Sequence, residues 1–426
     1  MSWFAMVSIA RKNLFEDIPR FLVAQAGIMF AVSLVTIQTG ILNGFTRSTV
    51  LLIENSTADL WMAAREMENL ELTQPIPAER VTQAQQVEGV ARAEALAIQS
   101  GRWISPSGDI ASVRIIGYDP AGQLFRLWNV TQGSQADIRQ PYSLIVDEAN
   151  LKSLGFDQVG EQANIGAAPA RLVGLTKGTQ SIASSAFVFT SLENTKAYAT
   201  AGLTSTVRCR TQAQGGVDCT TVYERLQASP NQAAPNAPAI SEPQPLNAND
   251  PIAYVLVKAE AGQDVTNLQR RLNDQFPNNH TYTRAEMANI TRDYWQRRTG
   301  IGFVLGLGAT VGIIVGVVIV GQILYSSVSD NIKEFGTLKA MGASDWIIYR
   351  VIIEQALWMA ILGYIPSIGL CLGLGTWTFA TQGIMILITP ISAAGIFAIT
   401  VGMCVGSAIF AIQKVTHVDP AIVFKA

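Results

Sequence analysis

The sequence predicts an α-helical membrane protein with four transmembrane helices and a large α+β extracytoplasmic domain between the first and second of them. Two observations on its 426 residues predict this class. Only 15% of the residues are charged, against about 25% in an average soluble protein, and 49% are hydrophobic. The apolar residues are also unevenly placed, because no charged residue occurs in residues 21–46, 299–329 or 355–413.

These three uncharged stretches contain the predicted transmembrane helices. A spanning helix needs about 20 apolar residues. The first two stretches each accommodate one helix, at 21–44 and 299–328. The third is long enough for two helices, at 350–380 and 392–413, joined by a short extracytoplasmic loop at 381–391. The first helix is expected to remain as an anchor, because its apolar stretch exceeds the roughly 7–15 residues of a signal-peptide core.

Basic residues in the short loops set the predicted orientation. The loop 329–349 carries Lys333 and Lys339, with Arg350 directly after it, whereas 381–391 carries no basic residue. The positive-inside rule therefore places 329–349 in the cytoplasm. With four spans, both termini are then cytoplasmic and the segment between the first two spans is extracytoplasmic.

The two ends of the chain are expected to be short cytoplasmic segments. Residues 1–20 predict an amphipathic helix on the inner membrane surface, with Trp3, Val7 and Leu14 along one side. Residues 414–426 form the predicted cytoplasmic tail. The protein is thus expected in the inner (plasma) membrane as a multi-pass protein in contact with the lipid bilayer.

The predicted extracytoplasmic domain, residues 45–298, reads as α+β. The elements expected in it are a helix at 77–86, a strand at 89–98, a hairpin at 101–117, a strand at 253–258 and a helix at 264–276. Such helix–strand units are typical of small two-layer α/β domains. The proline-rich stretch 229–251 is expected to be an extended linker without a core of its own.

Two of the four cysteines, Cys209 and Cys219, fall in a polar part of this domain, while Cys371 and Cys404 fall within predicted spans. Disulfides persist in oxidising compartments. A Cys209–Cys219 disulfide is therefore one interpretation, and two unpaired thiols are the other.

No residue pattern indicates an enzyme. We expect no catalytic, cofactor-binding or metal site, and we interpret His280, in a polar sequence, as a surface turn residue. The chain contains no Gly-Lys dipeptide and hence no Walker A loop, so any ATP that powers it must be bound by another polypeptide. A net charge of −2 argues against a nucleic-acid partner.

The cytoplasmic loop contains one predicted helix, within residues 330–345. Ile332, Phe335, Leu338 and Met341 repeat every three residues and form one apolar stripe. This pattern fits either an amphipathic helix on the membrane surface or a helix that docks in a groove of a cytoplasmic partner.

Glycines mark the second predicted span as a packing helix. Their spacing follows the small-xxx-small pattern, which lets membrane helices approach closely. They are Gly302, Gly306, Gly308, Gly312 and Gly316.

The loop sequence KEFGTLKAMGAS resembles the FtsX/MacB superfamily of ABC-transporter permeases. The matching residues are Lys333, Glu334, Gly336, Leu338, Lys339, Ala340, Met341, Gly342 and Ala343. The ending at 418–426 is similar to the C-terminal segment of that superfamily. The first span followed by ADLW at 58–61 resembles the DevC type, the permeases of the heterocyst glycolipid exporter class.

This resemblance implies a homodimeric permease bound to a separate ABC ATPase that holds ATP and magnesium, with no cofactor in this chain. The cytoplasmic helix would be the coupling helix that ATPase closure pushes. The residues implied in ATPase coupling are Ile332, Lys333, Glu334, Phe335, Gly336, Leu338, Lys339, Met341, Gly342 and Ala343.

The resemblance also implies what the assembly does. A periplasmic adaptor (membrane-fusion) protein and an outer-membrane channel would complete a tripartite exporter of a glycolipid or other amphiphile, driven by mechanotransmission. Two alternatives remain open. One is an FtsX-like non-transporting transmitter that activates a cell-wall hydrolase, and the other is lipoprotein extraction of the LolC/LolE type.

Overall fold

The chain forms two compact units, which divide it at the end of the first predicted span and the start of the second. One unit comprises Thr46–Arg298, and the other comprises Met1–Phe45 with Thr299–Ala426. The computed structural model describes residues 18–201, 203–211, 217–225, 242–332, 334, 336–337, 344–382 and 385–416. Residues 1–17 of the predicted amphipathic helix and 417–426 of the predicted tail lie outside them.

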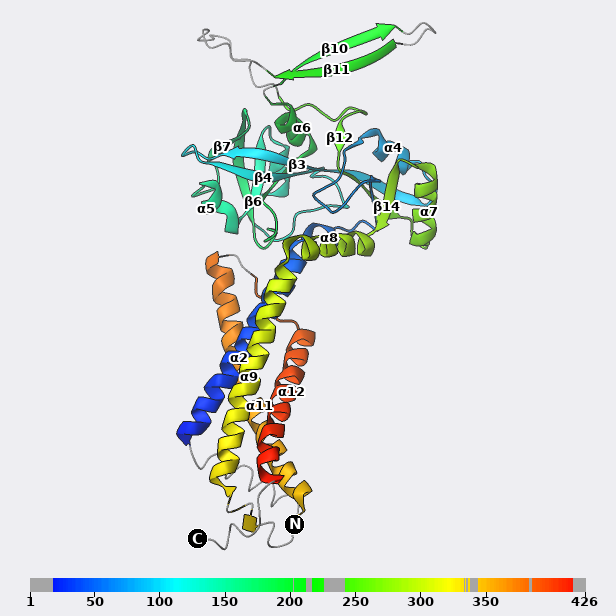
Figure 1. The fold of residues 1–426 in the computed structure, drawn as a ribbon. Helices are drawn as coiled ribbons and strands as arrows, with labels where there is room; N and C mark the ends of the chain where they lie inside the picture. The colour runs from blue at the N-terminus through cyan, green and yellow to red at the C-terminus, as the bar shows by residue number, and fades with distance from the viewer. Residues whose placement is uncertain are drawn as a thin grey trace. The chain divides into compact units, whose positions relative to one another are not determined.

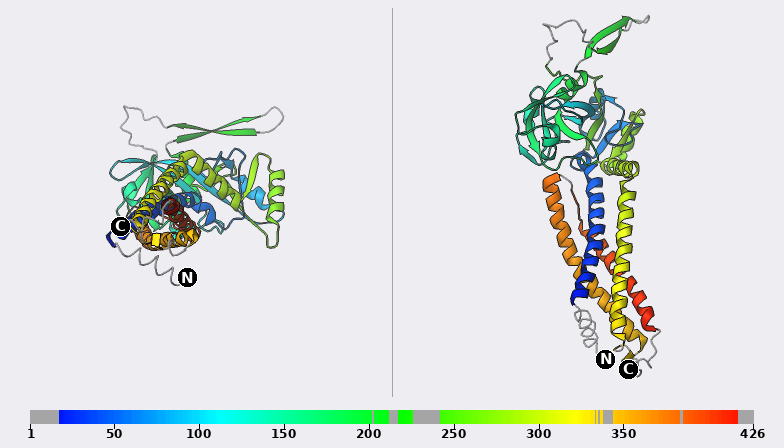
Figure 2. Two further views of the ribbon diagram at one scale, coloured as in Figure 1. Left: turned by 60° about the horizontal axis from the view of Figure 1, so that its bottom comes forward. Right: turned by 60° about the vertical axis from the view of Figure 1, so that its left-hand side comes forward.

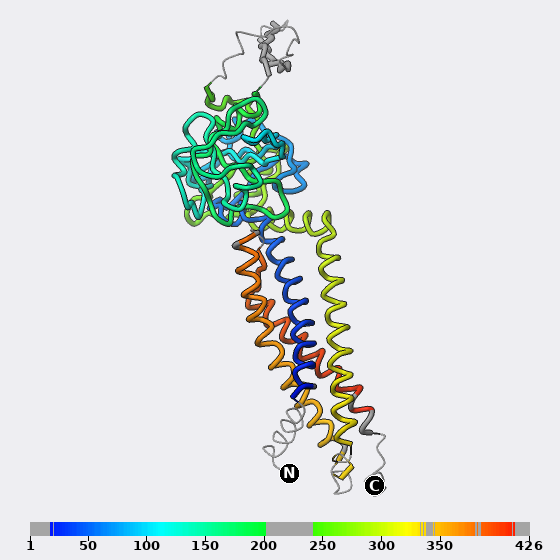
Figure 3. The backbone as a smooth tube through the Cα atoms, turned by 90° about the vertical axis from the view of Figure 1, so that its left-hand side faces the viewer, coloured from blue at the N-terminus to red at the C-terminus, as the bar shows by residue number. Residues whose placement is uncertain are grey.

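The unit that comprises residues 1–45 and 299–426 is called the helical unit below. Its described part contains four long helices, and in Figures 1 and 2 they run side by side. They are α2 (Ile18–Ser48), α9 (Ile301–Asp330), α11 (Asp345–Gln382) and α12 (Pro390–Thr416). Each is long and apolar enough to cross a membrane, which confirms the predicted number of candidate spans. Figure 3 shows α2 and α9 as long uninterrupted coils.

Each of these helices extends past its predicted span at one end or both. The span predicted at 350–380 begins five residues too late, because α11 begins at Asp345 and includes the charged residues Arg350 and Glu354. Likewise α2 continues through Arg47 to Ser48. Hydrogen bonding, not hydropathy, sets where a helix ends.

The four helices share one buried apolar cluster. Each helix contributes several residues, including Ile28 and Val32 of α2, Leu324 of α9, Met359 of α11 and Cys404 of α12. Side-chain hydrogen bonds also join the helices. Among them, Ser407 Oγ of α12 donates to Val317 O of α9 at 2.9 Å, and the Tyr364 hydroxyl of α11 donates to Ala393 O of α12 at 2.7 Å. The helical unit is therefore packed as one body.

The other unit, Thr46–Arg298, is called the outer unit below. It is built on a ten-stranded sheet with the order β14-β1-β13-β3-β4-β9-β6-β8-β5, in which β7 pairs with both β3 and β8. The strands are β1 (Leu60–Ala64), β3 (Val90–Ile104), β4 (Ile110–Tyr118), β5 (Val130–Gln132), β6 (Ser143–Asp147), β7 (Gln162–Ile165), β8 (Ala168–Thr176), β9 (Ala186–Ser191), β13 (Tyr254–Ala259) and β14 (Asn279–Thr283). The domain is α+β, as predicted.

One half of this sheet is a split βαβ arrangement. Strands β14, β1, β13 and β3 are antiparallel, with α4 (Glu79–Gln85) between β1 and β3 and α7 (Val265–Gln275) between β13 and β14. This β-α-β-β-α-β pattern is ferredoxin-like. Helix α7 starts where the Asp264 side chain accepts the Thr266 N–H at 2.9 Å, as an N-cap does.

Side chains of neighbouring helices seal the outer edge of β14. The Thr281 N–H donates to Asn273 Oδ1 at 2.7 Å, and Thr281 O accepts from Gln269 Nε2 at 2.9 Å. The Thr283 N–H donates to Glu286 Oε2 at 2.8 Å. The backbone groups of an edge strand that would otherwise invite another strand are thus occupied.

The other half of the sheet closes into a ring of six strands, which the sequence did not predict. Around the ring the order is β3, β4, β9, β6, β8 and β7, and β7 pairs back to β3. Its buried interior includes Trp103, Val113, Leu144, Phe156 and Val188.

The predicted break between a strand at 89–98 and a hairpin at 101–117 is wrong. Strand β3 runs without interruption from Val90 to Ile104, because it serves both halves of the sheet. Gly101 lies inside the strand, where a Cβ would stand 2.8 Å from Ile115 Cδ1. The glycine there permits close packing and does not form a turn.

The described part of the predicted linker 229–251 is also not a free linker. β12 (Pro251–Ile252) pairs with β2 (Ile76–Pro77), and Leu246 packs on a buried cluster. Residues 226–241 lie outside the described chain. The remaining elements are α3 (Leu51–Glu54), η1 (Gln135–Arg139), η2 (Glu148–Asn150), α5 (Leu151–Leu154), α6 (Leu192–Thr200), β10 (Leu203–Thr211), β11 (Val217–Arg225) and α8 (Arg284–Thr299).

Replacement of the buried Asn194 should loosen the segment between η1 and β6. Its Oδ1 accepts the Tyr142 N–H at 2.8 Å, and its Nδ2 donates to Ile138 O and Gln140 O, both at 3.0 Å. Asn194→Ala leaves these buried groups unpaired, at a cost of roughly 1–3 kcal/mol. Hydrogen exchange of residues 138–143 in the full chain should accelerate. The exposed Asn164→Ala is the matched control, and equal exchange in both variants would contradict this role.

Candidate functional site

The predicted coupling segment lies mostly outside the described residues. Those outside are Lys333, Phe335, Leu338, Lys339, Met341, Gly342 and Ala343. Of the others, Ile332, Glu334 and Gly336 are helical; the Glu334 side chain is exposed and Gly336 is buried. The Glu334 N–H donates to Asn331 O at 3.1 Å.

The five predicted packing glycines of α9 separate into two groups. A Cβ at Gly308 would overlap Gln38 of α2, and one at Gly316 would overlap Met403 of α12. At Gly312 it would stand 3.2 Å from Leu34 Cδ2 of α2. These three glycines therefore lie where α9 meets its neighbours. At Gly302 and Gly306 a Cβ would have no atom of the described chain within 4 Å.

Sequence reasoning missed a second glycine contact, on α2. Residues 385–389 between α11 and α12, which are not helical, lie against this helix. The Leu387 N–H donates to Gly40 O at 2.9 Å. A Cβ on Gly40 would stand 2.5 Å from Ile386 Cγ2, and one on Gly44 would overlap the Met385 carbonyl oxygen. The spacing Gly40-xxx-Gly44 was the available signal, because small residues four apart open one helix face to close approach.

The two extracytoplasmic cysteines lie on a β-hairpin. β10 and β11 are antiparallel, and the register places Cys209 directly opposite Cys219. Directly opposed residues in such a ladder have Cα atoms about 4.5–5.5 Å apart, which falls within the range of disulfides, about 4.4–6.8 Å. The backbone pairing is therefore compatible with the disulfide interpretation.

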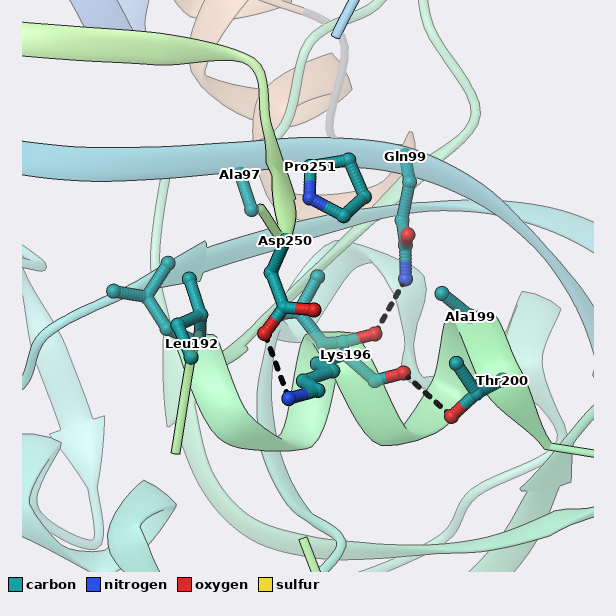
Figure 4. Close-up of a pocket in the computed structure, with 10 residues that line it drawn as sticks. Ala97, Gln99, Leu192, Lys196, Ala199, Thr200, Asp250 and Pro251 are labelled. Carbon is teal, nitrogen blue, oxygen red and sulfur yellow. Dashed lines mark hydrogen bonds and ion pairs between the residues drawn. The ribbon is translucent and has the colours of Figure 1, made fainter. Parts of the chain in front are cut away.

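The outer unit also contains a pocket of about 220 Å³ that the sequence did not indicate (Figure 4). Strand β3 contributes Ala97 and Gln99. Helix α6 and the segment that leads into β12 form the rest, with Leu192, Thr195, Lys196, Ala199, Thr200, Leu246, Asp250 and Pro251. Lys196 Nζ pairs with Asp250 Oδ2 at 2.7 Å, as Figure 4 shows.

The part of the chain that the structure describes holds no candidate metal site. No group of three or more His, Cys, Asp or Glu side chains there could hold a metal ion. The interpretation of His280 as a turn residue is wrong, because it lies within β14, opposite Ala63 of β1, with its ring centroid 4.5 Å from that of Tyr282.

Two protein-family models match the chain. The MacB-like periplasmic core domain matches residues 21–275, and the FtsX-like permease C-terminal domain matches residues 306–420. No match was found among curated proteins.

Solved structures of two outer domains resemble part of the chain. The periplasmic region of MacB from Actinobacillus actinomycetemcomitans is 10% identical, with a TM-score of 0.32; the match covers 55% of this chain and 92% of that one. The extracellular domain of the noncanonic ABC-type transporter YknZ from Gram-positive bacteria is 11% identical, with a TM-score of 0.31; the match covers 53% of this chain and 99% of that one.

Gly44→Ala should destabilise the helical unit. The added methyl group collides with the Met385 carbonyl oxygen, so the segment 385–389 must move, at a cost of about 1–3 kcal/mol. Gly373→Ala is the matched control, since its Cβ meets no described atom within 4 Å and alanine favours a helix by about 1 kcal/mol. The thermal midpoint in lipid nanodiscs should fall for the first variant only; equal midpoints would exclude the contact.

The disulfide interpretation predicts how many cysteines react with an alkylating reagent. The chain has four cysteines. If Cys209 and Cys219 are joined, the denatured, unreduced protein takes up two alkyl groups and the reduced protein four. Cys209→Ser should take up three without reduction. Four groups on the unreduced wild-type protein, prepared from its membrane under thiol-blocking conditions, would establish two free thiols instead.

Proposed function

The chain belongs to the MacB/FtsX family of ABC-transporter permeases, and from that premise we propose that it is the permease subunit of an ATP-driven exporter. The observation that carries the proposal is that the two family models together match residues 21–275 and 306–420. Members of this family are membrane-embedded permease components with an extracytoplasmic domain.

In this proposal a separate ABC ATPase supplies the energy. ATP and magnesium bind to that second polypeptide, and the helix predicted within residues 330–345 receives its motion. The apolar stripe of the helix supports this role, because a short amphipathic helix suits a groove in a partner. The exposed Glu334 and Thr337 lie off that stripe.

The proposed cargo is a glycolipid or another amphiphile, and the proposed assembly is a permease homodimer with an adaptor protein and an outer-membrane channel. The similarity of the sequence to the DevC type supports this finer assignment. Chain connectivity supports a mechanical relay, since α2 continues without a break from the helical unit into the first residues of the outer unit.

Co-purification from the native membrane tests the proposal. We expect an ABC ATPase, an adaptor protein and an outer-membrane channel to be retained with the tagged permease. Recovery of a peptidoglycan hydrolase in place of the adaptor would replace export with signal transmission. Recovery of lipoproteins and a lipoprotein carrier would favour extraction of the LolC/LolE type.

Charge placed on the apolar stripe should uncouple the ATPase. Phe335→Asp and Met341→Asp each put a carboxylate into a contact that excludes water, which is costly without a partner. We expect the complex to assemble and ATP-dependent export in proteoliposomes to fall at least tenfold. Thr337→Asp adds the same charge off the stripe and should retain export. Normal export by both stripe variants would contradict the coupling role.

A further inference from the structure

The pocket beside α6 lies between two groups of residues that pack on one face of strand β3. Side chains two apart on a strand share a face. On one face of β3, Ala93 and Ala95 lie against the cluster beneath α4, while Gly101 and Trp103 adjoin the interior of the strand ring. Ala97 and Gln99, between these two sets, line the pocket. The space thus arises from the fold, at the changeover between its two halves.

The position of α6 keeps this space open. A Cβ on Gly117 would overlap Thr195, so α6 lies directly on β4 at that point. On the β3 side, the small side chain of Ala97 lines one part of the pocket. In the neighbouring part, Gln99 Nε2 extends from β3 to α6 and donates to Thr195 O at 2.7 Å. Figure 4 shows this hydrogen bond and Ala97 at the pocket wall.

The polar groups around the pocket are already paired. Lys196 Nζ contacts Asp250 Oδ2 at 2.7 Å and donates to Pro245 O at 3.0 Å. Thr200 Oγ1 donates to Lys196 O, also at 3.0 Å. The two opposite charges compensate each other, so the pocket offers a ligand mainly the apolar surface of Leu192, Leu246 and their neighbours.

The volume of the pocket limits the size of the ligand that it can hold. A cavity of about 150 Å³ holds one benzene molecule, so about 220 Å³ has room for roughly eight carbon atoms. A complete lipid is larger than this. The end of one aliphatic chain fits, with the remainder of the molecule outside the mouth.

We propose that this pocket binds the aliphatic chain end of a neutral amphiphile and leaves the head group in solvent. The compensated Lys196–Asp250 pair favours a neutral head group over a charged one. That the ligand is the exported molecule rests on the proposed function. The pocket then recognises the aliphatic chain of the amphiphile and not its head group. In that case it lies on the extracytoplasmic part of the export pathway.

Photo-crosslinking tests this binding. The probe is an octyl β-glucoside with a diazirine at the chain end, added below its micellar concentration to the full chain in lipid nanodiscs. We expect crosslinks in peptides that contain Leu192–Thr200 and residues 246–251. Unlabelled alkyl glucosides should compete, with a potency that rises about fourfold for each added CH₂ group up to roughly eight carbons and then levels off.

Two variants narrow the pocket in different ways. Ala97→Leu fills it from β3, and Ala199→Trp covers it from α6. Each should reduce crosslinking at α6 at least tenfold. Ala121→Leu makes the same change as the first variant at an exposed site outside the pocket and should stay within twofold of the wild-type protein. Hydrogen exchange of β3 and β4 establishes that each variant is folded.

Two results would overturn the inference. One is crosslinking confined to the membrane helices, and the other is equal crosslinking of α6 in the wild-type protein and both folded pocket variants. The readout is separate from ATPase binding. If the ATPase co-purifies and the pocket is not labelled, the pocket inference fails and the proposed function stands. If the pocket is labelled and no ATPase co-purifies, the export role fails and the binding site stands.

Discussion

The outer unit depends on the pairing of one long strand. The first part of β3 pairs with β13, and the second part pairs with β4 and β7. Along its length β3 must therefore fit different neighbouring strands as well as the layers that pack on its two faces. This requirement accounts for the small residues Ala93, Ala95, Ala97 and Gly101 on one face, while Leu96 on the opposite face is fully buried in the main core.

The helical unit depends on the close approach of the backbone at 385–389 to the glycines of α2. Buried backbone groups without water need partners within the protein, and a segment that is not helical cannot find them in its own turn. Residues 385–389 obtain them from α2, where Leu387 N–H donates to Gly40 O and Asn43 Nδ2 donates to Leu387 O. A bulky side chain at Gly40 or Gly44 would separate these groups. The glycines thus determine where the chain can return between α11 and α12.

Local sequence signals predicted several elements of the structure. The four apolar helices follow from uncharged stretches, and α7 follows from the helical spacing of its apolar residues. The short helix α4 and the strand β13 follow from the residue types of their segments. The strand ring and the pocket could not be predicted, since they depend on β7 returning to β3 and on α6 lying over Gly117. The predicted break between 98 and 101 was wrong because the local sequence does not show that one strand, β3, pairs with β13 in its first part and with β4 in its second.

The sealed edge of β14 restricts how other molecules can recognise this side of the outer unit. Many partners attach to a protein by adding a strand to an open sheet, a mode that reads backbone more than sequence. Asn273, Gln269 and Glu286 occupy the groups that such an addition would need. Recognition along β14 must therefore rely on surface shape and side-chain chemistry, so an extended peptide without a matching surface has little to bind there.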